Sequence, residues 1–127
     1  MKNQRARGVT KDGKPIFNED HEHIIVADWL NAKGIMFIHT PNEGRRSWAT
    51  GKKLKRMGMR KGVPDFLIFD KPMVFAPGAA LELKALDGAR PSEEQLGFLD
   101  RLDERGWLIH WCRGADAAIE WLESLGY

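Results

Sequence analysis

Two charged residues interrupt a stretch of sequence that is otherwise apolar. In ALELKAL, residues 80–86, Glu82 and Lys84 stand two positions apart. Alternate residues of a β-strand point to the same face, so these two would share one face and the neighbouring leucines the other. A pair of this kind on a strand surface contributes only about 0.2–1 kcal/mol. The apolar context therefore favours a chemical role over a structural one.

A further carboxylate stands at the head of the preceding apolar run. Asp65 directly follows Gly62-Val63-Pro64 and begins DFLIFD, residues 65–70, which predicts a strand. If this strand pairs with ALELKAL, Asp65 and Glu82 converge. Two carboxylates and a backbone carbonyl form an oxygen-only site suited to Mg²⁺ or Mn²⁺. Lys84 beside it could orient a water or stabilise phosphate charge.

The elements that would position these residues follow from periodicity and from turn signals. A helix is expected from a cap at Asn18 or Asp20 to Lys33-Gly34, and Ser92 with Gln95 forms the pattern of a capping box before a second helix that Gly106 ends. The order is α-β-β-β-α-β-α, with a loop at 42–63 that could hold a short helix. The expected spans are a helix at 20–33, strands at 35–40, 65–70 and 80–86, a helix from 93 to 105, a strand at 107–112 and a helix at 115–125.

Length and composition exclude several classes of protein. The chain has 127 residues, 43% hydrophobic and 30% charged, which fits one domain of ordinary globular composition. A single cysteine, Cys112, cannot form an internal disulfide, so a reducing compartment is expected. No apolar run reaches the roughly 18 residues that span a bilayer, and the first residues lack the apolar core of a secretory signal. We therefore expect neither a membrane protein nor a secreted one.

Charge is divided unevenly along the chain. Residues 1–64 carry 14 Lys and Arg against 6 Asp and Glu, whereas residues 65–127 carry 6 against 12. The segment 45–61 holds eight cations and no acid, which favours binding to a polyanion over a solvated loop. Trp48 in this segment could stack on a base. The candidate DNA contacts are Arg45, Arg46, Trp48, Lys52, Lys53, Lys55, Arg56, Arg60 and Lys61.

The two ends of this basic half differ in composition. Residues 1–18 combine cations with Gly8, Gly13 and Pro15 and little apolar content, which indicates a flexible basic arm. Residues 19–127 would then form the folded domain.

Together, these motifs resemble a known nuclease family. Pro64-Asp65 followed by Glu82-Leu83-Lys84 is similar to the PD-(D/E)xK nuclease motif. With Asn42-Glu43-Gly44 before the basic segment, Gly62 before Pro64, and Ser92 and Gln95 after the motif, the sequence resembles the virus-type replication-repair nuclease (VRR-NUC) domain over about residues 19–125. The resemblance implies a restriction-endonuclease-like α/β fold, with a central mixed four-stranded sheet flanked by helices.

The resemblance also implies roles for individual residues. Asp65 and Glu82 would ligate Mg²⁺ or Mn²⁺, with the backbone carbonyl of Leu83 as a further ligand. An acidic residue of the first helix would complete the metal site, and Glu22 matches that position best, with Glu19 as the alternative. Lys84 would position the attacking water. Gln95 would support the site or contact the phosphate.

The function that the resemblance implies is a Mg²⁺-dependent, structure-selective DNA endonuclease. Members of the family cut branched DNA such as four-way (Holliday) junctions as homodimers, and a location in the cytoplasm of a bacterial or phage-infected cell is expected. The alternative is a non-catalytic DNA-binding accessory module that keeps the fold. Such a module has no need of Asp65, Glu82 and Lys84 together, so their presence favours catalysis.

The histidines offer a weaker signal. His21-Glu22-His23 lacks the i, i+4 histidine spacing of a zinc-binding H-E-x-x-H motif, so zinc is not expected. His39 and His110 lie near predicted strand ends and are interpreted as hydrogen-bonded structural residues, although His39 could face the active cleft.

Overall fold

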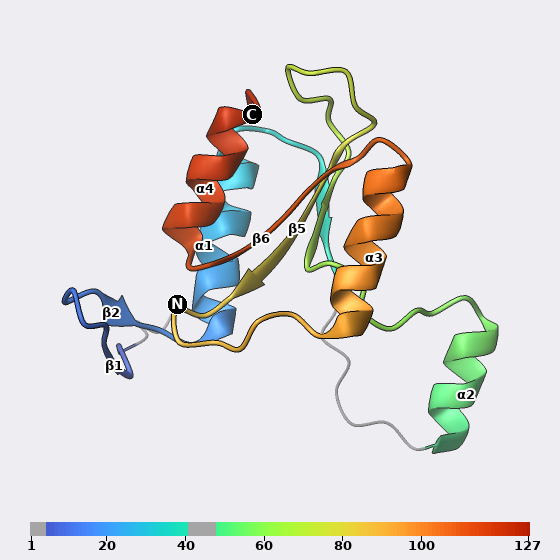
Figure 1. Cartoon of the computed structure of the whole chain (residues 1–127), viewed down its shortest axis with the longest axis horizontal. Helices are drawn as coiled ribbons and strands as arrows, with labels where there is room; N and C mark the ends of the chain where they lie inside the picture. The colour runs from blue at the N-terminus through green and yellow to red at the C-terminus, as the bar shows by residue number, and fades with distance from the viewer. Residues whose placement is uncertain (1–4, 41–47) are drawn as a thin grey trace.

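A central four-stranded sheet with helices on both faces organises the chain (Figure 1). The computed structural model describes residues 5–40 and 48–127. Its elements in chain order are β1 (Gly8–Val9), β2 (Pro15–Ile16), α1 (Glu19–Ala32), β3 (Phe37–His39), α2 (Trp48–Arg56), β4 (Phe66–Ile68), β5 (Ala79–Lys84), α3 (Glu93–Glu104), β6 (Leu108–Arg113) and α4 (Ala115–Ser124).

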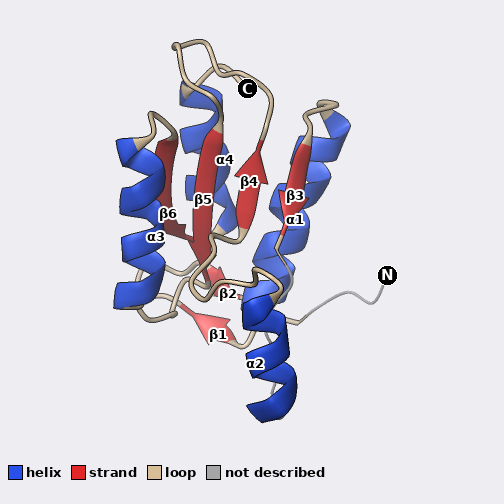
Figure 2. Ribbon diagram, turned by 90° about the vertical axis from the view of Figure 1, so that its right-hand side faces the viewer, coloured by secondary structure: helices blue, strands red, loops and turns tan. Residues whose placement is uncertain are grey.

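The sheet has the strand order β3-β4-β5-β6. The first three strands pair antiparallel, and β6 pairs parallel to β5 after the crossover through α3. Helices α1 and α4 lie together on one face, and α3 covers the other (Figure 2). The expected α/β fold with a mixed four-stranded sheet is confirmed, and the expected hairpin of the second and third core strands is present as β4 and β5.

The register between β4 and β5 brings the candidate catalytic residues together at one end of the sheet. Phe66 of β4 pairs with Leu81 of β5, so Asp65, one residue before β4, lies beside Glu82. Strand β5 ends at Lys84, at the same end of the sheet where α1 and α3 begin (Figure 1). The carboxylates of two strands and the first turns of two helices therefore meet there.

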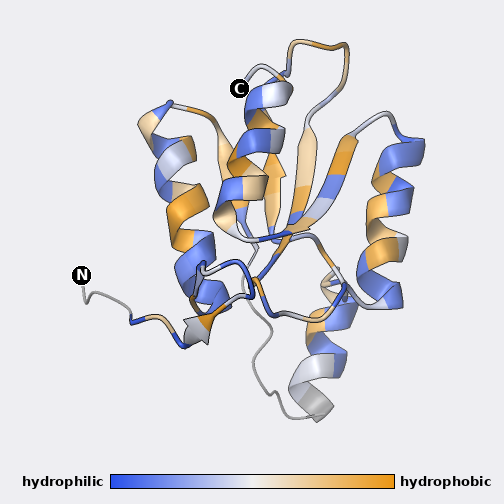
Figure 3. Ribbon diagram, turned by 60° about the vertical axis from the view of Figure 1, so that its left-hand side comes forward, coloured by the Kyte–Doolittle hydropathy of each residue, from blue (hydrophilic) through white to orange (hydrophobic). Residues whose placement is uncertain are grey.

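The core is apolar on both sides of β5. Ala79 to Leu83 are all buried, and Phe66, Ile68, Val26, Leu30 and Leu122 are fully buried around them. The central strands consist mostly of hydrophobic residues, whereas hydrophobic and hydrophilic residues alternate along the helices (Figure 3). Burying each such side chain contributes roughly 1.5–3 kcal/mol, so this core holds the site-bearing strands rigidly.

Helix caps fix where α1 and α3 begin. Asn18 Oδ1 accepts a hydrogen bond from the His21 backbone N–H at 2.9 Å, so Asn18 is the cap of α1. Ser92 Oγ accepts from the Gln95 N–H, and the Gln95 side chain accepts from the Ser92 N–H, which is the expected capping box. Both caps bring a first helical turn to the site.

Two elements extend beyond the expected core. The possible helix within the basic segment is present as α2, which projects from the sheet (Figure 2). The segment interpreted as a flexible arm contains the β1–β2 hairpin, which the sequence analysis did not predict. Arg7 ties this hairpin to the body through an ion pair with Asp87, Nη2 to Oδ1 at 2.7 Å.

None of the helices in the described residues is long and apolar enough to cross a bilayer.

Candidate active site

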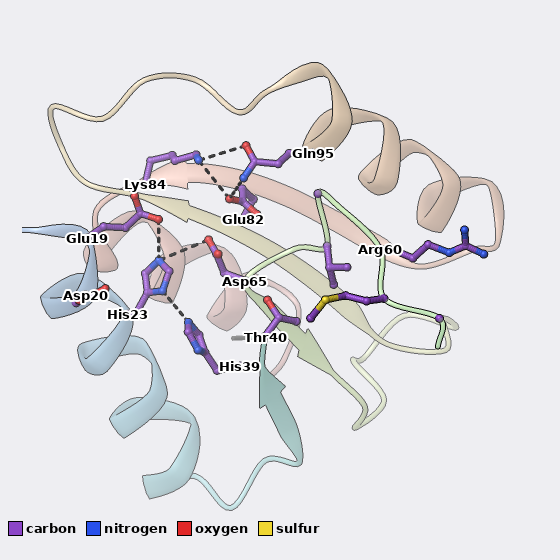
Figure 4. Close-up of a pocket in the computed structure, with 14 residues that line it drawn as sticks. Glu19, Asp20, His23, His39, Thr40, Arg60, Asp65, Glu82, Lys84 and Gln95 are labelled. Carbon is purple, nitrogen blue, oxygen red and sulfur yellow. Dashed lines mark hydrogen bonds and ion pairs between the residues drawn. The ribbon is translucent and has the colours of Figure 1, made fainter. Parts of the chain in front are cut away.

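A cavity of about 640 Å³ opens at the end of the sheet where β5 finishes (Figure 4). Its walls come from the first turns of α1 and α3, the end of β3, the loop between α2 and β4, and strand β5. The residues that line it are Glu19, Asp20, His23, His39, Thr40, Gly58, Met59, Arg60, Gly62, Val63, Asp65, Glu82, Lys84 and Gln95. Four of the five predicted catalytic residues, Asp65, Glu82, Lys84 and Gln95, therefore line one cavity, and Glu22 is not among the lining residues.

Asp65 is held in place by hydrogen bonds from the two segments that flank it, β5 and the end of β3. Its Oδ2 accepts a 2.8 Å hydrogen bond from the Leu83 N–H, and its backbone oxygen accepts one from the Thr40 N–H at 2.9 Å. The preceding Gly62 has φ +78°, and a Cβ there would lie 2.7 Å from the backbone of Glu94. Only glycine allows this close approach between the loop and α3. The Gly-Val-Pro-Asp sequence thus fixes the carboxylate against β5.

Glu82 is a buried carboxylate with an unsatisfied oxygen. It is 1% exposed, its Oε1 accepts a 2.9 Å hydrogen bond from Gln95 Nε2, and its Oε2 has no hydrogen-bond partner among the described residues. Burial and, to a lesser extent, the neighbouring Asp65 raise the pKa of Glu82 to about 8, against the opposing effect of Lys84. Two carboxyl groups crowded in this way are stabilised by a cation between them.

Lys84 and Gln95 form a small network with Glu82. Lys84 Nζ lies 3.4 Å from Glu82 Oε1 and 3.3 Å from Gln95 Oε1. The same Gln95 oxygen accepts from the Ser92 N–H at 2.8 Å, so the capping box of α3 also positions the site. The arrangement holds an ammonium group at the mouth of an acidic cavity (Figure 4).

A histidine and a second glutamate approach Asp65 from α1. His23 Nε2 lies 3.5 Å from Glu19 Oε1, 3.5 Å from Asp65 Oδ2 and 2.9 Å from the Leu83 carbonyl oxygen. One donor atom from each of Glu19, His23 and Asp65 lies within 4.8 Å of the others. This is a possible metal group of mixed nitrogen and oxygen donors.

His39 supports His23 from the edge strand. Its Nε2 lies 2.7 Å from His23 Nδ1, and the two rings are edge to face at 4.9 Å. Burial and the neighbouring His23 lower the pKa of His39. His39 is thus hydrogen-bonded, as expected, and it also lines the cavity. His110 instead stacks on Trp121, away from the cavity.

The structure places Glu22, the acidic residue that best matched the metal site, at the first turn of α4 and outside the lining of the cavity. Glu22 is 5% exposed, and its Oε2 accepts a hydrogen bond from the Ala115 N–H. Ala115 begins α4, whose cap residue Gly114 has no side chain, so a carboxylate from α1 satisfies the helix end and its positive dipole. Glu19 is the acidic residue of the first helix that lines the cavity with Asp65. Glu22 is thus a structural cap of α4.

His23 is the residue that sequence reasoning missed. The sequence pattern around it, His21-Glu22-His23, lacks the spacing of a zinc motif and gives no other sign of a role for His23. The available signal was its position four residues after Glu19, which places both on one helix face. The carbonyl oxygen of Leu83, expected as a metal ligand, lies 2.9 Å from His23 Nε2 in this structure.

The described cations that are expected to bind DNA lie on α2 and in the loop that follows it. Lys52, Lys53, Lys55 and Arg56 are exposed on α2, Lys61 is exposed after it, and Arg60 lines the cavity. Arg45, Arg46 and the side chain of Trp48 lie outside the described residues. The basic segment therefore reaches the acidic cavity at residues 58–60.

Comparison with known proteins bears on the fold. No protein-family model and no curated protein matches the sequence. Among solved structures, a VRR_NUC domain protein is similar to this chain, with a TM-score of 0.71 and 22% sequence identity over 85% of this chain and 87% of that one. The chain therefore has the fold of a VRR-NUC domain, as the motifs predicted.

Proposed function

We propose that this chain, which has the fold of a VRR-NUC domain, is a metal-dependent endonuclease that hydrolyses phosphodiester bonds of DNA. The observation that carries the proposal is the meeting of Asp65, Glu82 and Lys84 in one cavity, with Glu82 Oε2 buried and unpartnered. A buried carboxylate oxygen without a partner destabilises a fold, so its presence here supports a site for a cation.

The residues present fit a divalent cation. Asp65, Glu82 and the Leu83 carbonyl offer hard oxygen donors suited to Mg²⁺ or Mn²⁺, with Glu19 and His23 on the α1 side. When bound, such an ion lowers the pKa of its water and offsets the charge that develops on the phosphate.

The remaining residues position and stabilise. Lys84 would hold the attacking water and stabilise negative charge on the phosphate, since its ammonium group stands beside the carboxylates. Gln95 would hold the side chains of Glu82 and Lys84 in position through its hydrogen bonds to both. These are contributions of the chain itself, and each can be removed by one substitution.

The charge distribution supports a nucleic acid substrate. An acidic cavity alone would repel phosphates, so the exposed cations of α2 and residues 60 and 61 would hold the backbone against it. We further propose a branched substrate, the four-way junction, cut by a homodimer. A domain of this size contacts a short stretch of duplex, and two copies would engage different arms of a junction.

The second candidate is a non-catalytic DNA-binding module. It would use the same cations, but it has no use for a buried carboxylate whose pKa is raised to about 8 beside Asp65 and Lys84. The complete charged set favours catalysis.

Cleavage of plasmid and of a synthetic mobile four-way junction tests the proposal. We expect nicking with Mg²⁺ or Mn²⁺, none in excess EDTA, and loss of at least about 100-fold in Asp65→Asn with junction binding retained. Asp100→Asn on the exposed side of α3 is the matched control and should cleave normally. Junction binding without cleavage under all metals would favour the accessory module.

Light scattering and a cruciform plasmid test the dimer. A dimer that nicks both strands in one encounter gives linear product early, whereas independent nicks give nicked circles first. A monomeric mass with nicked circles alone would contradict the paired mechanism.

A further inference from the structure

One imidazole nitrogen and three oxygen atoms converge between α1 and the ends of the central strands. His23 Nε2 lies 2.9 Å from the Leu83 carbonyl oxygen and 3.5 Å from a carboxylate oxygen of both Glu19 and Asp65. Lone pairs at these separations repel unless a proton or a cation lies among them. His23 is 9% exposed, so water can do little to relieve the crowding. Either a proton on His23 Nε2, which would donate to the Leu83 carbonyl, or a bound cation therefore lies among these atoms.

The orientation of the His23 ring is fixed by a partner outside the cluster. His39 Nε2 lies 2.7 Å from His23 Nδ1, which leaves Nε2 as the nitrogen that faces the carboxylates. A second residue on the far ring nitrogen is the usual arrangement of metal-binding histidines, because it sets the tautomer and the direction of the lone pair. His39 itself packs edge to face on buried Phe66, so it has a rigid support.

We infer that His23 is a nitrogen ligand that makes this subsite prefer a transition-metal cation such as Mn²⁺ to Mg²⁺, with His39 as its positioning residue. Mg²⁺ favours oxygen donors in near-ideal octahedral geometry, whereas imidazole suits the first-row transition metals. The oxygen donors Glu82 and Asp65 alone would not discriminate between the two ions. The inference deepens the proposed nuclease function and rests on it for biological meaning, but it concerns binding.

Metal binding without DNA tests the inference. Isothermal titration with Mn²⁺ and with Mg²⁺ should give at least tenfold tighter binding of Mn²⁺ to the wild type. His23→Gln should weaken the binding of Mn²⁺ by at least about tenfold. It should change the affinity for Mg²⁺ far less, since the amide keeps an oxygen donor. His21→Gln, on the same helix and outside the cavity, is the matched control and should keep both affinities. Equal preference for the two ions in the wild type would overturn the inference.

Electron spin echo modulation of the Mn²⁺ complex detects a nitrogen atom bound to the ion. The measurement on the wild type alone is already informative. A ¹⁴N modulation from imidazole is expected in the wild type and in His21→Gln, and not in His23→Gln. His39→Ala should lower Mn²⁺ affinity roughly tenfold, and His39→Gln should recover most of it by restoring an acceptor for His23 Nδ1. Mn²⁺ bound with no nitrogen modulation would overturn the assignment of His23. Nitrogen modulation in a protein that cleaves no DNA would instead uphold it and contradict the proposed nuclease.

Discussion

The side chain of Gln95 joins the start of α3 to the buried carboxylate of Glu82. Its Nε2 donates a 2.9 Å hydrogen bond to Glu82 Oε1, while its Oε1 accepts from the Ser92 N–H at 2.8 Å. One residue thus serves as both half of a capping box and support of the candidate catalytic acid. A helix cap that is set by local sequence therefore also determines the position of a carboxylate 13 residues away.

The two roles of Gln95 can be separated by comparison with Ser92. Ser92→Ala removes the other half of the capping box without touching Glu82, and Gln95→Ala removes both functions. We expect both variants to lose about 1 kcal/mol of unfolding free energy, as for other helix caps. Only Gln95→Ala should lower cleavage, by at least about tenfold, because Glu82 and Lys84 lose their common partner. Equal cleavage by the two variants would show that Gln95 is a cap alone.

Much of the fold was predictable because its signals are local. The Ser92 and Gln95 pattern, the leucines of α3 and the apolar runs of β4 and β5 each specify an element within a few residues. Asp65, Glu82 and Lys84 were predicted as a site because the period of two in a strand determines which side chains share a face. The β1–β2 hairpin was not, since strands of two residues carry no periodicity to detect.

The choice between Glu19 and Glu22 shows where sequence reasoning stops. The two lie three positions apart, so both are on nearly the same side of α1. Which one faces the cavity depends on the rotation of the helix, which is set by packing of Val26 and Leu30 and by the need of α4 for an acceptor at its first turn. These are contacts between segments that are far apart in the chain, and no local pattern records them.

Matched glutamines test this assignment. Glu19→Gln should weaken Mn²⁺ and Mg²⁺ binding at least about tenfold, with the unfolding free energy in EDTA changed by no more than about 0.5 kcal/mol. Glu22→Gln should do the reverse: metal affinity is retained, and roughly 1 kcal/mol of stability is lost as the charge at the N-terminus of α4 is removed. Titration calorimetry and urea unfolding measure the two effects. A loss of metal affinity confined to Glu22→Gln would restore Glu22 to the metal site.

The raised pKa of Glu82 should make the stability of the metal-free protein depend on pH. This pKa is raised in the fold from an ordinary value of 4.5 to about 8, so between these pH values the folded state holds a proton that the unfolded state releases. The metal-free protein should therefore lose stability as pH rises from 4.5 to 8, by up to about 1.4 kcal/mol per pH unit, and level off above 8. Glu82→Gln in EDTA should remove most of this slope, and urea unfolding at several pH values measures it.

The same proton competes with the metal. Since a cation binds the ionised carboxylate, the apparent affinity for Mg²⁺ should rise with pH up to about 8, by at most about tenfold per pH unit. An affinity that is constant from pH 6 to pH 8 would mean that Glu82 does not bind the ion.

The cations of α2 predict the salt dependence of DNA binding. If Lys52, Lys53, Lys55 and Arg56 contact phosphates, replacing all four by glutamine should flatten the slope of log K against log salt by up to about 0.9 for each lost duplex contact. The matched control removes four exposed cations from the opposite end of the molecule: Lys33, Lys71, Arg101 and Arg105.

The two quadruple variants have the same net charge, so any difference between their slopes reports location. Fluorescence anisotropy of a labelled junction at several salt concentrations measures both. We expect the control to keep nearly the wild-type slope, because none of its cations lines the cavity where the DNA would be bound, and salt screens more distant charges over about 10 Å at 0.1 M. Equal slopes would show that net charge alone, and not α2, holds the substrate, and the basic segment would then be a solvated surface.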